Sequence, residues 1–378
     1  MKVYLDNAST TSVSKEVLDV MLPFFKEEYG NPSSLYEIGI KNKKVINNAR
    51  NKIANLLNCQ RNEIFFTSCG TESINWALKG IASKNNTKSD IITTRVEHHA
   101  TLNSCEYLEK QGYTILFVDV DNKGFVNLDH LKSLISESTL IVSIIMANNE
   151  IGTIQNIKKI SEICNKANTY LHIDAVQAIC HTTINLQETS IDLLSISGHK
   201  FHSPKGIGLL YIKKGTHIAP LIHGGQQEQK MRAGTENVAF IVGMAKALEI
   251  GLTNLKDYEE RLNTYAKMFL KRLDEAKIDY LLNGAEIGKN RLPGNLNLSF
   301  KGLDGQVLEY LLNKKGIYVS TSSACDSESI ESSHVLKEIN VPKEYINGTI
   351  RFSIGSYTTF DELIFVIDNV IEIINQEK

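Results

Sequence analysis

Short runs of Ile, Val, Leu and Phe recur along the middle of this chain, and they constrain its fold more than any other feature. They lie at residues 63–67, 90–94, 114–118, 140–146, 170–174, 193–197 and 208–212. Continuous apolar runs of this length are typical of strands that are buried on both faces of a sheet. Segments 72–83, 100–111 and 157–168 between them have helical apolar spacing. The alternation predicts repeated βα units and a mostly parallel sheet flanked by helices, which is the α/β class.

The last third of the chain has a different pattern. A long helical stretch begins after Thr235 and continues through the charged segment 254–274. Short strands at 295–300, 317–320 and 349–353 then alternate with helices at 306–313 and 359–376, which is an α+β pattern. Because 378 residues exceed what one hydrophobic core usually organises, we expect two domains. The large one spans residues 14–255, and the smaller α+β domain combines 1–13 with 256–378.

Composition excludes several classes of protein. Hydrophobic residues make up 42% and charged residues 22% of the chain, which is ordinary for a globular protein. A net charge of −2 gives no indication of a nucleic-acid surface. The start of the chain lacks the apolar core of a signal peptide, and no apolar run has the length of a membrane span. We therefore expect a cytoplasmic protein that binds neither membranes nor nucleic acid.

The six cysteines are widely spaced and form no CxxC pair. This spacing suggests neither a disulfide framework nor a metal site. We expect Cys59, Cys105, Cys164 and Cys180 to be buried, inert thiols, because most free cysteines are.

A lysine and a carboxylate stand at the ends of two predicted strands. Lys200 lies in a turn of small, polar and basic residues at 197–206, and Asp174 ends the run 170–174. Alone, the lysine would be read as a solvated side chain and the aspartate as a helix N-cap. Pyridoxal-phosphate (PLP) chemistry needs both groups, a lysine for the Schiff base and an acid that keeps the pyridine nitrogen protonated. Ligands of α/β sheets bind where such strands end.

A phosphate cradle is predicted at residues 66–73, where a strand, a tight turn containing Gly70 and the start of a helix follow one another. Backbone N–H groups at a helix start bind anions well. The alternative is an ordinary helix start capped by Ser68 or Thr71.

Together these motifs resemble the NifS/IscS-like cysteine desulfurases, which are fold-type-I PLP enzymes related to class-V aminotransferases. The resemblance covers nearly the whole chain. The matching segments are 4–11, 30–34, 71–73, 97–98, 148–152, 174–177, 197–200, 223–225, 232–237, 323–325 and 351–353.

The resemblance implies a role for each matching residue. Lys200 would hold the cofactor covalently, Asp174 would pair with the pyridine nitrogen, and His98 would stack on the ring and move protons. Gln177 and Asn149 would lie near the ring hydroxyl. The cofactor phosphate would be held by five residues: Gly70, Thr71, Ser197, His199 and, from a neighbouring subunit, Thr235. The substrate carboxylate would be held by Asn31 and Arg351. A homodimer is therefore implied.

Two of these residues have other readings. His98 alone could be a core or surface imidazole. Arg351 could form a surface ion pair, but it stands within a strand-like run that would be buried, so we expect it to need an anionic partner.

Cys325 differs from the other cysteines because it lies in a polar stretch, residues 319–328, between a predicted strand and a predicted helix. A thiolate on an exposed loop can reach a cofactor and then carry sulfur outward, which a packed thiol cannot do. The implied reaction removes sulfur from L-cysteine, giving alanine and a persulfide on Cys325. Acceptor proteins for iron–sulfur assembly, tRNA thiolation or another thio-modification would receive that sulfur.

Five positions depart from the usual pattern of the family: Tyr36, Cys69, Ser203, Gln226 and Ser322. They leave three alternatives open. A selenocysteine lyase would share the same residues. A catalytically weak scaffold would keep the fold without the chemistry. An aminotransferase or β-lyase would leave the Cys325 loop unexplained.

Overall fold

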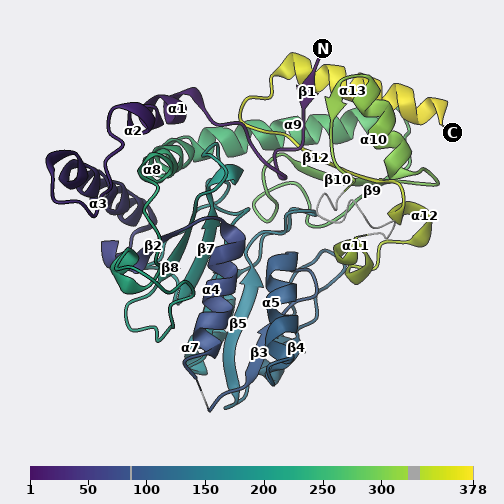
Figure 1. Cartoon of the computed structure of the whole chain (residues 1–378). Coiled ribbons are helices and arrows are strands. Elements are labelled where there is room, and N and C mark those ends of the chain that lie inside the picture. Colours follow the sequence, from purple (N-terminus) through teal and green to yellow (C-terminus); the bar gives the residue numbers. More distant parts are fainter. Residues whose placement is uncertain (86, 322–332, 378) are drawn as a thin grey trace.

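A seven-stranded sheet organises the larger lobe of the computed structural model, which describes residues 1–85, 87–321 and 333–377 (Figure 1). The strand order is β2-β8-β7-β6-β5-β3-β4, with β8 antiparallel to β2 and β7 and the other neighbours parallel. The strands are β2 (Ile64–Thr67), β3 (Asp90–Thr93), β4 (Thr114–Phe117), β5 (Thr139–Ile145), β6 (Tyr170–Asp174), β7 (Leu193–Ser197) and β8 (Gly208–Ile212). The predicted mostly parallel sheet is confirmed.

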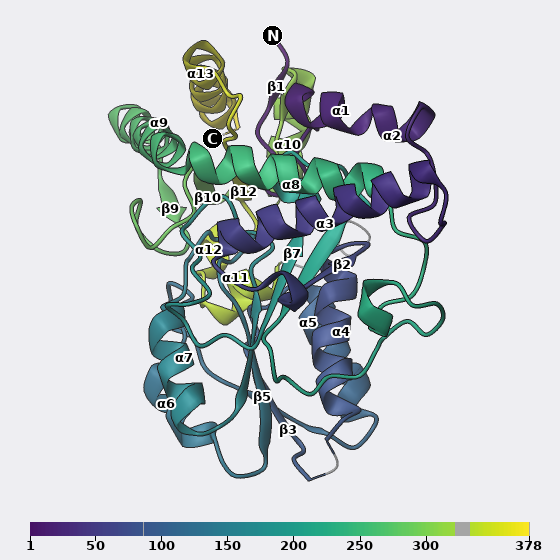
Figure 2. The same cartoon turned by 90° about the vertical axis from the view of Figure 1, so that its left-hand side faces the viewer.

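Helices cover both faces of this sheet, as Figure 2 shows edge-on. One face carries α4 (Gly70–Ala82) and α5 (His99–Glu109), and the other carries α6 (Leu128–Leu134) and α7 (Ile157–Lys166). Adjacent strand residues accordingly enter different cores: Phe65 and Leu193 pack with α4 and α5, whereas Phe66 and Leu194 pack into the core on the opposite face. This alternation explains why both residues of each pair are apolar.

The smaller lobe has its own core around antiparallel strands. Here β10 (Asn295–Phe300) lies between β9 (Tyr280–Leu282) and β12 (Thr349–Ser353). At the N-terminus, β1 (Val3–Tyr4) pairs in parallel with β11 (Ile317–Tyr318). Val3 and Leu5 are buried in the same core as residues 262–374. These separate cores support the proposed division at residues 13/14 and 255/256, which remains a prediction.

The remaining helices are α1 (Lys15–Met21), α2 (Pro23–Lys26), α3 (Glu37–Leu57), α8 (Val238–Thr253), α9 (Leu255–Glu275), α10 (Gly305–Lys314), α11 (His334–Glu338), α12 (Lys343–Ile346) and α13 (Phe360–Gln376). The helical stretch expected after Thr235 is thus two helices, and α8 and α9 meet at Asn254 with a bend of 66°. Among the described residues no single helix has both the length and the apolar character to cross a membrane, and only this bent pair meets those criteria jointly.

A buried ion pair fixes the loop that precedes α8. The Arg50 guanidinium donates to both carboxylate oxygens of Glu228, at 2.8 and 2.6 Å, and the same carboxylate accepts the Phe66 N–H at 3.0 Å. Glu228, Gln229 and Lys230 all have positive φ, a left-handed conformation that is costly for side chains other than glycine. The ion pair therefore holds a strained turn against β2.

We predict that Arg50→Met lowers the free energy of unfolding by about 3–5 kcal/mol, because it leaves the Glu228 charge buried without its partner. Urea unfolding would measure the loss. Lys52→Met is the matched control on the same helix, since its ion pair with Glu249 is exposed, and it should cost less than about 1 kcal/mol. Equal losses in the two variants would contradict the assignment.

Candidate functional site

A cavity of about 450 Å³ opens where β6 and β7 end. Its walls come from the starts of α4 and α5, from the ends of these strands, and from β12 of the smaller lobe. The predicted residues that line it are Gly70, Thr71, His98, Asn149, Asp174, Gln177, Ser197, His199, Lys200 and Arg351. The strand-end geometry that suggested a ligand site thus brings together residues that are far apart in the sequence.

The N-terminal segment crosses this cavity and contacts its polar residues. Lys200, in the short helix η2 (Gly198–Lys200), donates to the carbonyls of Ala8 at 2.6 Å and Ser9 at 2.8 Å. Gln177 Nε2 donates to the Ala8 carbonyl as well, at 2.7 Å. His199 Nδ1 lies 3.2 Å from the Thr10 hydroxyl. Sequence reasoning did not predict that residues 8–10 hold the cavity's lysine in place.

Asp174 is a buried carboxylate whose charged form a nearby positive charge would stabilise. Its residue is 2% exposed, and one oxygen accepts the Val176 N–H at 2.9 Å. Burial raises the pKa of Asp174 to about 6, although the Val176 hydrogen bond and the Lys200 charge oppose this rise. A cationic N–H group placed in the cavity would therefore be stabilised beside it.

The N-terminus of α4 has the geometry expected of an anion cradle. A Cβ atom on Gly70 would lie only 2.7 Å from Val176 Cγ2 and 3.2 Å from Ser197 Cβ, so this position requires glycine. The N-cap is Cys69, whose sulfur accepts the Glu72 N–H at 3.4 Å. The alternative cap by Ser68 or Thr71 is wrong, because Cys69 is the extended residue at the boundary and Gly70 already starts the helix. The first N–H groups and the helix dipole favour an anion here.

His98 is held neutral with a defined tautomer. It is the N-cap of α5, and its Nδ1 accepts the Ala100 N–H at 3.0 Å. Burial, followed by the charge of Lys200, lowers the pKa of His98 to about 4. Since Nδ1 is an acceptor, the proton of the neutral ring resides on Nε2, which makes His98 a hydrogen-bond donor.

Glu97 lines the cavity but was not assigned a role from the sequence. It is 1% exposed, and its Oε1 accepts the Thr94 hydroxyl at 2.7 Å, while Oε2 has no hydrogen-bond partner among the described residues. Burial raises the pKa of Glu97 to about 8, and the neighbouring Asp174 charge adds to the rise. A carboxylate three residues after the predicted strand 90–94, within the matching segment 97–98, was the available signal. His334 was missed too, since only the packing of α11 brings it to the cavity.

Arg351 is 2% exposed and already has an anionic partner within the chain. Its Nη2 donates to Asp6 Oδ1 and to the Ser9 hydroxyl, each at 2.8 Å, and Nη1 donates to the Asn149 carbonyl at 3.1 Å. Nε has no hydrogen-bond partner in the part of the chain that is described. The expected anionic partner is therefore Asp6, with donor capacity remaining for a second anion.

Cys325 and Ser322 lie outside the described residues. The residues that flank them contact the cavity. Ser320 pairs with Arg351 through backbone hydrogen bonds of 2.7 and 3.3 Å. The Ser333 hydroxyl donates to the Glu150 carboxylate at 2.5 Å, and Glu150 lines the cavity.

Two predicted site residues lie away from this cavity. Asn31 is exposed, and its side-chain oxygen accepts the Ser33 N–H at 2.9 Å. Thr235 is exposed in the loop before α8. Neither is among the residues that line the cavity.

The other cysteines behave largely as expected. Cys105, Cys164 and Cys180 are buried, whereas Cys59 is only half-buried. Burial raises the pKa of the Cys59, Cys105 and Cys164 thiols to about 12, and raises that of Cys180 further. These thiols therefore remain protonated and unreactive near neutral pH.

Among the departures from the family pattern, Ser203 is fully buried and would collide with any side chain at Gly198. Its hydroxyl oxygen has no partner among the described residues. Tyr36 and Gln226 are exposed. The structure gives no reason why either of these two exposed residues would alter the cavity.

Known proteins resemble this chain over nearly its whole length. Residues 3–365 match the model of the class-V aminotransferase family. A protein named cysteine desulfurase IscS, from Clostridium botulinum strain Hall, is 46% identical over 100% of this chain and 95% of its own length. A solved structure titled NifS-like protein superposes with a TM-score of 0.93 at 40% identity, covering 100% of both chains. Another, titled SspA in complex with cysteine, has a TM-score of 0.82 at 31% identity, covering 94% of this chain and 99% of the other.

We predict that Glu97 makes the stability of the ligand-free protein fall as pH rises from about 5 to 8. The folded state holds a proton on Glu97 up to about pH 8, whereas the unfolded state loses it near the ordinary value of 4.5. The folded state therefore binds more protons in this window, and the free energy of unfolding decreases with pH by at most about 1.4 kcal/mol per unit.

Urea unfolding at several pH values would measure this slope. Glu97→Gln should flatten it, and Glu109→Gln, an exposed position on α5, should leave it unchanged. A wild-type slope that persists in Glu97→Gln would contradict the prediction.

Proposed function

The chain belongs to the class-V aminotransferase family, and we propose that it is a PLP-dependent cysteine desulfurase. One observation carries this proposal: Lys200, the buried Asp174 and the anion cradle at Gly70 line one cavity. A lysine, an acid and a phosphate site in this arrangement match what a PLP enzyme requires.

The residues of the cavity fit the cofactor. When bound, PLP supplies an electron sink that stabilises negative charge on the carbon of an amino acid. Lys200 would hold it covalently, and Asp174 would keep the ring nitrogen protonated because a buried carboxylate favours a cationic neighbour. The flat face of the ring would lie against His98, and Gln177 and Asn149 would approach its hydroxyl.

The phosphate would lie at the start of α4. Gly70 and Thr71, the first residues of α4, line the cavity together with Ser197 and His199, and their backbone N–H groups would bind the phosphate. Thr235 of a second subunit would complete the site.

The substrate carboxylate would meet Arg351, and Asn149 would assist, whereas Asn31 lies away from this cavity within one chain. Arg351 is suited to this role because a guanidinium binds a carboxylate through two parallel hydrogen bonds. The carboxylate would compete with Asp6 and Ser9, which now occupy Nη2.

The sulfur acceptor in this proposal is Cys325. Its thiolate attacks the substrate sulfur, an S–S bond forms, and the Cβ–S bond of the substrate breaks with its electron pair left on carbon. Protonation of that carbon completes alanine, and the persulfide stays on Cys325. Lys200 and the Nε2–H of His98, which both line the cavity, would move the protons.

We place this chemistry in the cytoplasm, with acceptor proteins receiving the sulfur for iron–sulfur assembly or thiolation. Its support is that the cysteines of the described chain are free thiols, as in a reducing compartment. Finding the protein outside the cytoplasm after cell fractionation would contradict this placement.

We predict that Lys200→Ala abolishes the visible absorbance of bound PLP and alanine release from cysteine. Cys325→Ala should keep that absorbance but lower alanine release at least about 10³-fold, since it removes the nucleophile. Mass spectrometry of the peptide 320–337 after cysteine treatment should show one additional sulfur. Cys59→Ala serves as the control and should retain both properties. Unchanged alanine release in Cys325→Ala would defeat the proposal, and selenocysteine turnover above that of cysteine would favour the lyase.

In the same assay Arg351→Lys should lower kcat/KM for cysteine roughly 10- to 100-fold, because charged hydrogen bonds to the carboxylate are lost. The effect should appear mainly in KM. Arg272→Lys, whose ion pair with Asp368 is exposed, is the matched control.

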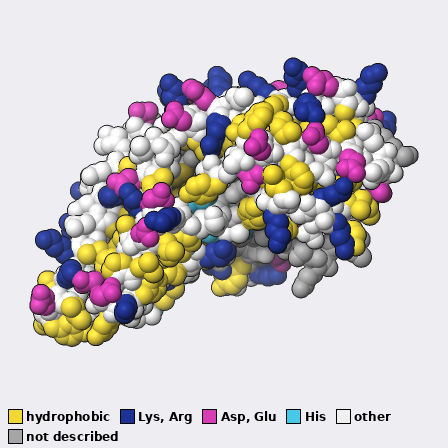
Figure 3. Space-filling view, turned by 90° about the horizontal axis from the view of Figure 1, so that it is seen from above, with side chains coloured by type: hydrophobic (Ala, Val, Ile, Leu, Met, Phe, Trp, Pro, Cys, Tyr) yellow, Lys and Arg dark blue, Asp and Glu magenta, His cyan; other side chains and the backbone are white. Residues whose placement is uncertain are grey.

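We also propose that the protein is a homodimer. Hydrophobic side chains are exposed around α2 and α3, and Leu35 is 91% exposed. The patch consists of Phe25, Tyr29, Leu35, Tyr36 and Ile40. Figure 3 shows hydrophobic side chains gathered at the end of the molecule where α2 and α3 lie in Figure 1. A large exposed patch of this kind marks an interaction surface.

We predict that sedimentation velocity at micromolar concentration gives the mass of two chains, and that Leu35→Glu shifts the distribution toward one chain. Thr235→Ala should weaken PLP binding without dissociating the dimer. A monomeric wild-type protein with full PLP occupancy would contradict this proposal.

A further inference from the structure

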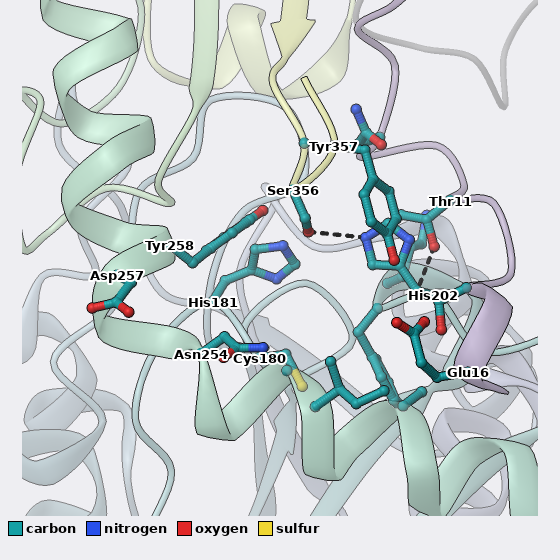
Figure 4. Close-up of a pocket in the computed structure, with 18 of the residues that line it drawn as sticks. Thr11, Glu16, Cys180, His181, His202, Asn254, Asp257, Tyr258, Ser356 and Tyr357 are labelled. Atoms are coloured by element: carbon teal, nitrogen blue, oxygen red, sulfur yellow. Dashed lines mark hydrogen bonds between the residues drawn. The ribbon is translucent and has the colours of Figure 1, made fainter. Parts of the chain in front are cut away.

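A second cavity of about 390 Å³ lies between the two lobes, next to the Lys200 turn (Figure 4). The large lobe contributes α1, the loop after β6 and the end of α8, and the small lobe contributes the start of α9 and the loop after β12. Its volume lies in the range typical of small-molecule sites, which are often found between domains.

The floor of this cavity is apolar. Cys180, Phe201, Ala247 and Ile250 form it together with Gly251. A Cβ atom on Gly251 would lie 2.5 Å from the sulfur of Cys180, so α8 approaches this loop as closely as its backbone permits. An apolar floor favours a ligand with an apolar body.

Two pairs of rings stand above the floor. His181 and Tyr258 have ring centroids 5.5 Å apart, and His202 and Tyr357 have theirs 4.8 Å apart. Burial lowers the pKa of His181 to about 4 and also lowers that of His202. The imidazoles are therefore neutral near pH 7, and the tyrosine faces offer negative electrostatic potential to a cation.

The rim of the cavity carries unpaired negative charge. Glu16 and Asp257 are among the residues that line it, from different lobes, and neither has a hydrogen bond or ion pair to its carboxylate among the described residues. Of the cations that line the cavity, Arg261 donates to the carbonyl of Ser356, which also lines it, and Lys200 donates to the carbonyls of Ala8 and Ser9 outside it.

We propose that this interlobe cavity is a second ligand site, which takes a small organic cation with an apolar body, such as a substituted ammonium ion. The apolar part would pack on the floor and the rings, and Glu16 and Asp257 would attract the charge. The site does not depend on the proposed desulfurase activity.

Binding in this cavity has a direct connection to Lys200. His202 follows it by two residues, and its ring nitrogens lie 2.9 Å from the Ser12 carbonyl and 3.0 Å from the Ser356 hydroxyl, which joins the lysine turn to the small lobe. A ligand that touches these groups therefore contacts both lobes at the turn that carries Lys200.

Isothermal titration of the PLP-loaded protein with benzyltrimethylammonium tests the site. This probe has no N–H group and cannot form an imine with PLP. We expect one molecule bound per chain, with affinity lowered about fivefold by Glu16→Gln and by Asp257→Asn, the size of a partly exposed charge interaction. Glu260→Gln, an exposed carboxylate on α9 that does not line the cavity, is the matched control and should leave the affinity unchanged.

Phenylacetate, an anion with the same ring, should not bind. Three results would each overturn the proposal: absence of binding by the cation, equal binding of phenylacetate, or unchanged affinity in both Glu16→Gln and Asp257→Asn. Because the readout is heat of binding, loss of desulfurase activity would not affect it.

Discussion

The hydrogen bonds of residues 6–9 hold the two lobes and the cavity in one arrangement. Lys200 and Gln177 of the large lobe donate to the Ala8 carbonyl, and Arg351 of the small lobe donates to Asp6 and Ser9. One short segment therefore satisfies charged groups from both sides. Without this segment, the buried Arg351 guanidinium and the Lys200 ammonium would lose hydrogen-bond acceptors. Leaving such charged donors unpaired is costly.

The same burial sets the electrostatics of the site. Asp174 and Glu97 are carboxyl groups with raised pKa values, and His98 is an imidazole with a lowered one. Each shift has desolvation as its largest cause, so burial disfavours every one of these charges. A ligand that brings a cationic ring nitrogen and an anionic phosphate would supply charges that the protein interior lacks.

The strands were predictable because their signal is local. Each run of residues 63–212 that was assigned as a strand is one, with ends that differ by a residue or two, because burial makes most of their positions apolar. The break between α8 and α9 at Asn254 was not predicted, since apolar and helix-forming residues continue on both sides. The site divides in the same way: motifs located Asp174 and Lys200, but the positions of His334 and Ala8 follow from tertiary packing.

The pairing of β1 with β11 also orders events during synthesis. Val3 leaves the ribosome early, but its partner Ile317 is made more than three hundred residues later, a delay of roughly 15 to 60 s at bacterial and eukaryotic elongation rates. The parallel sheet can assemble within that interval, while the first residues wait without a partner. The cavity next to Lys200 therefore closes only when translation is nearly finished.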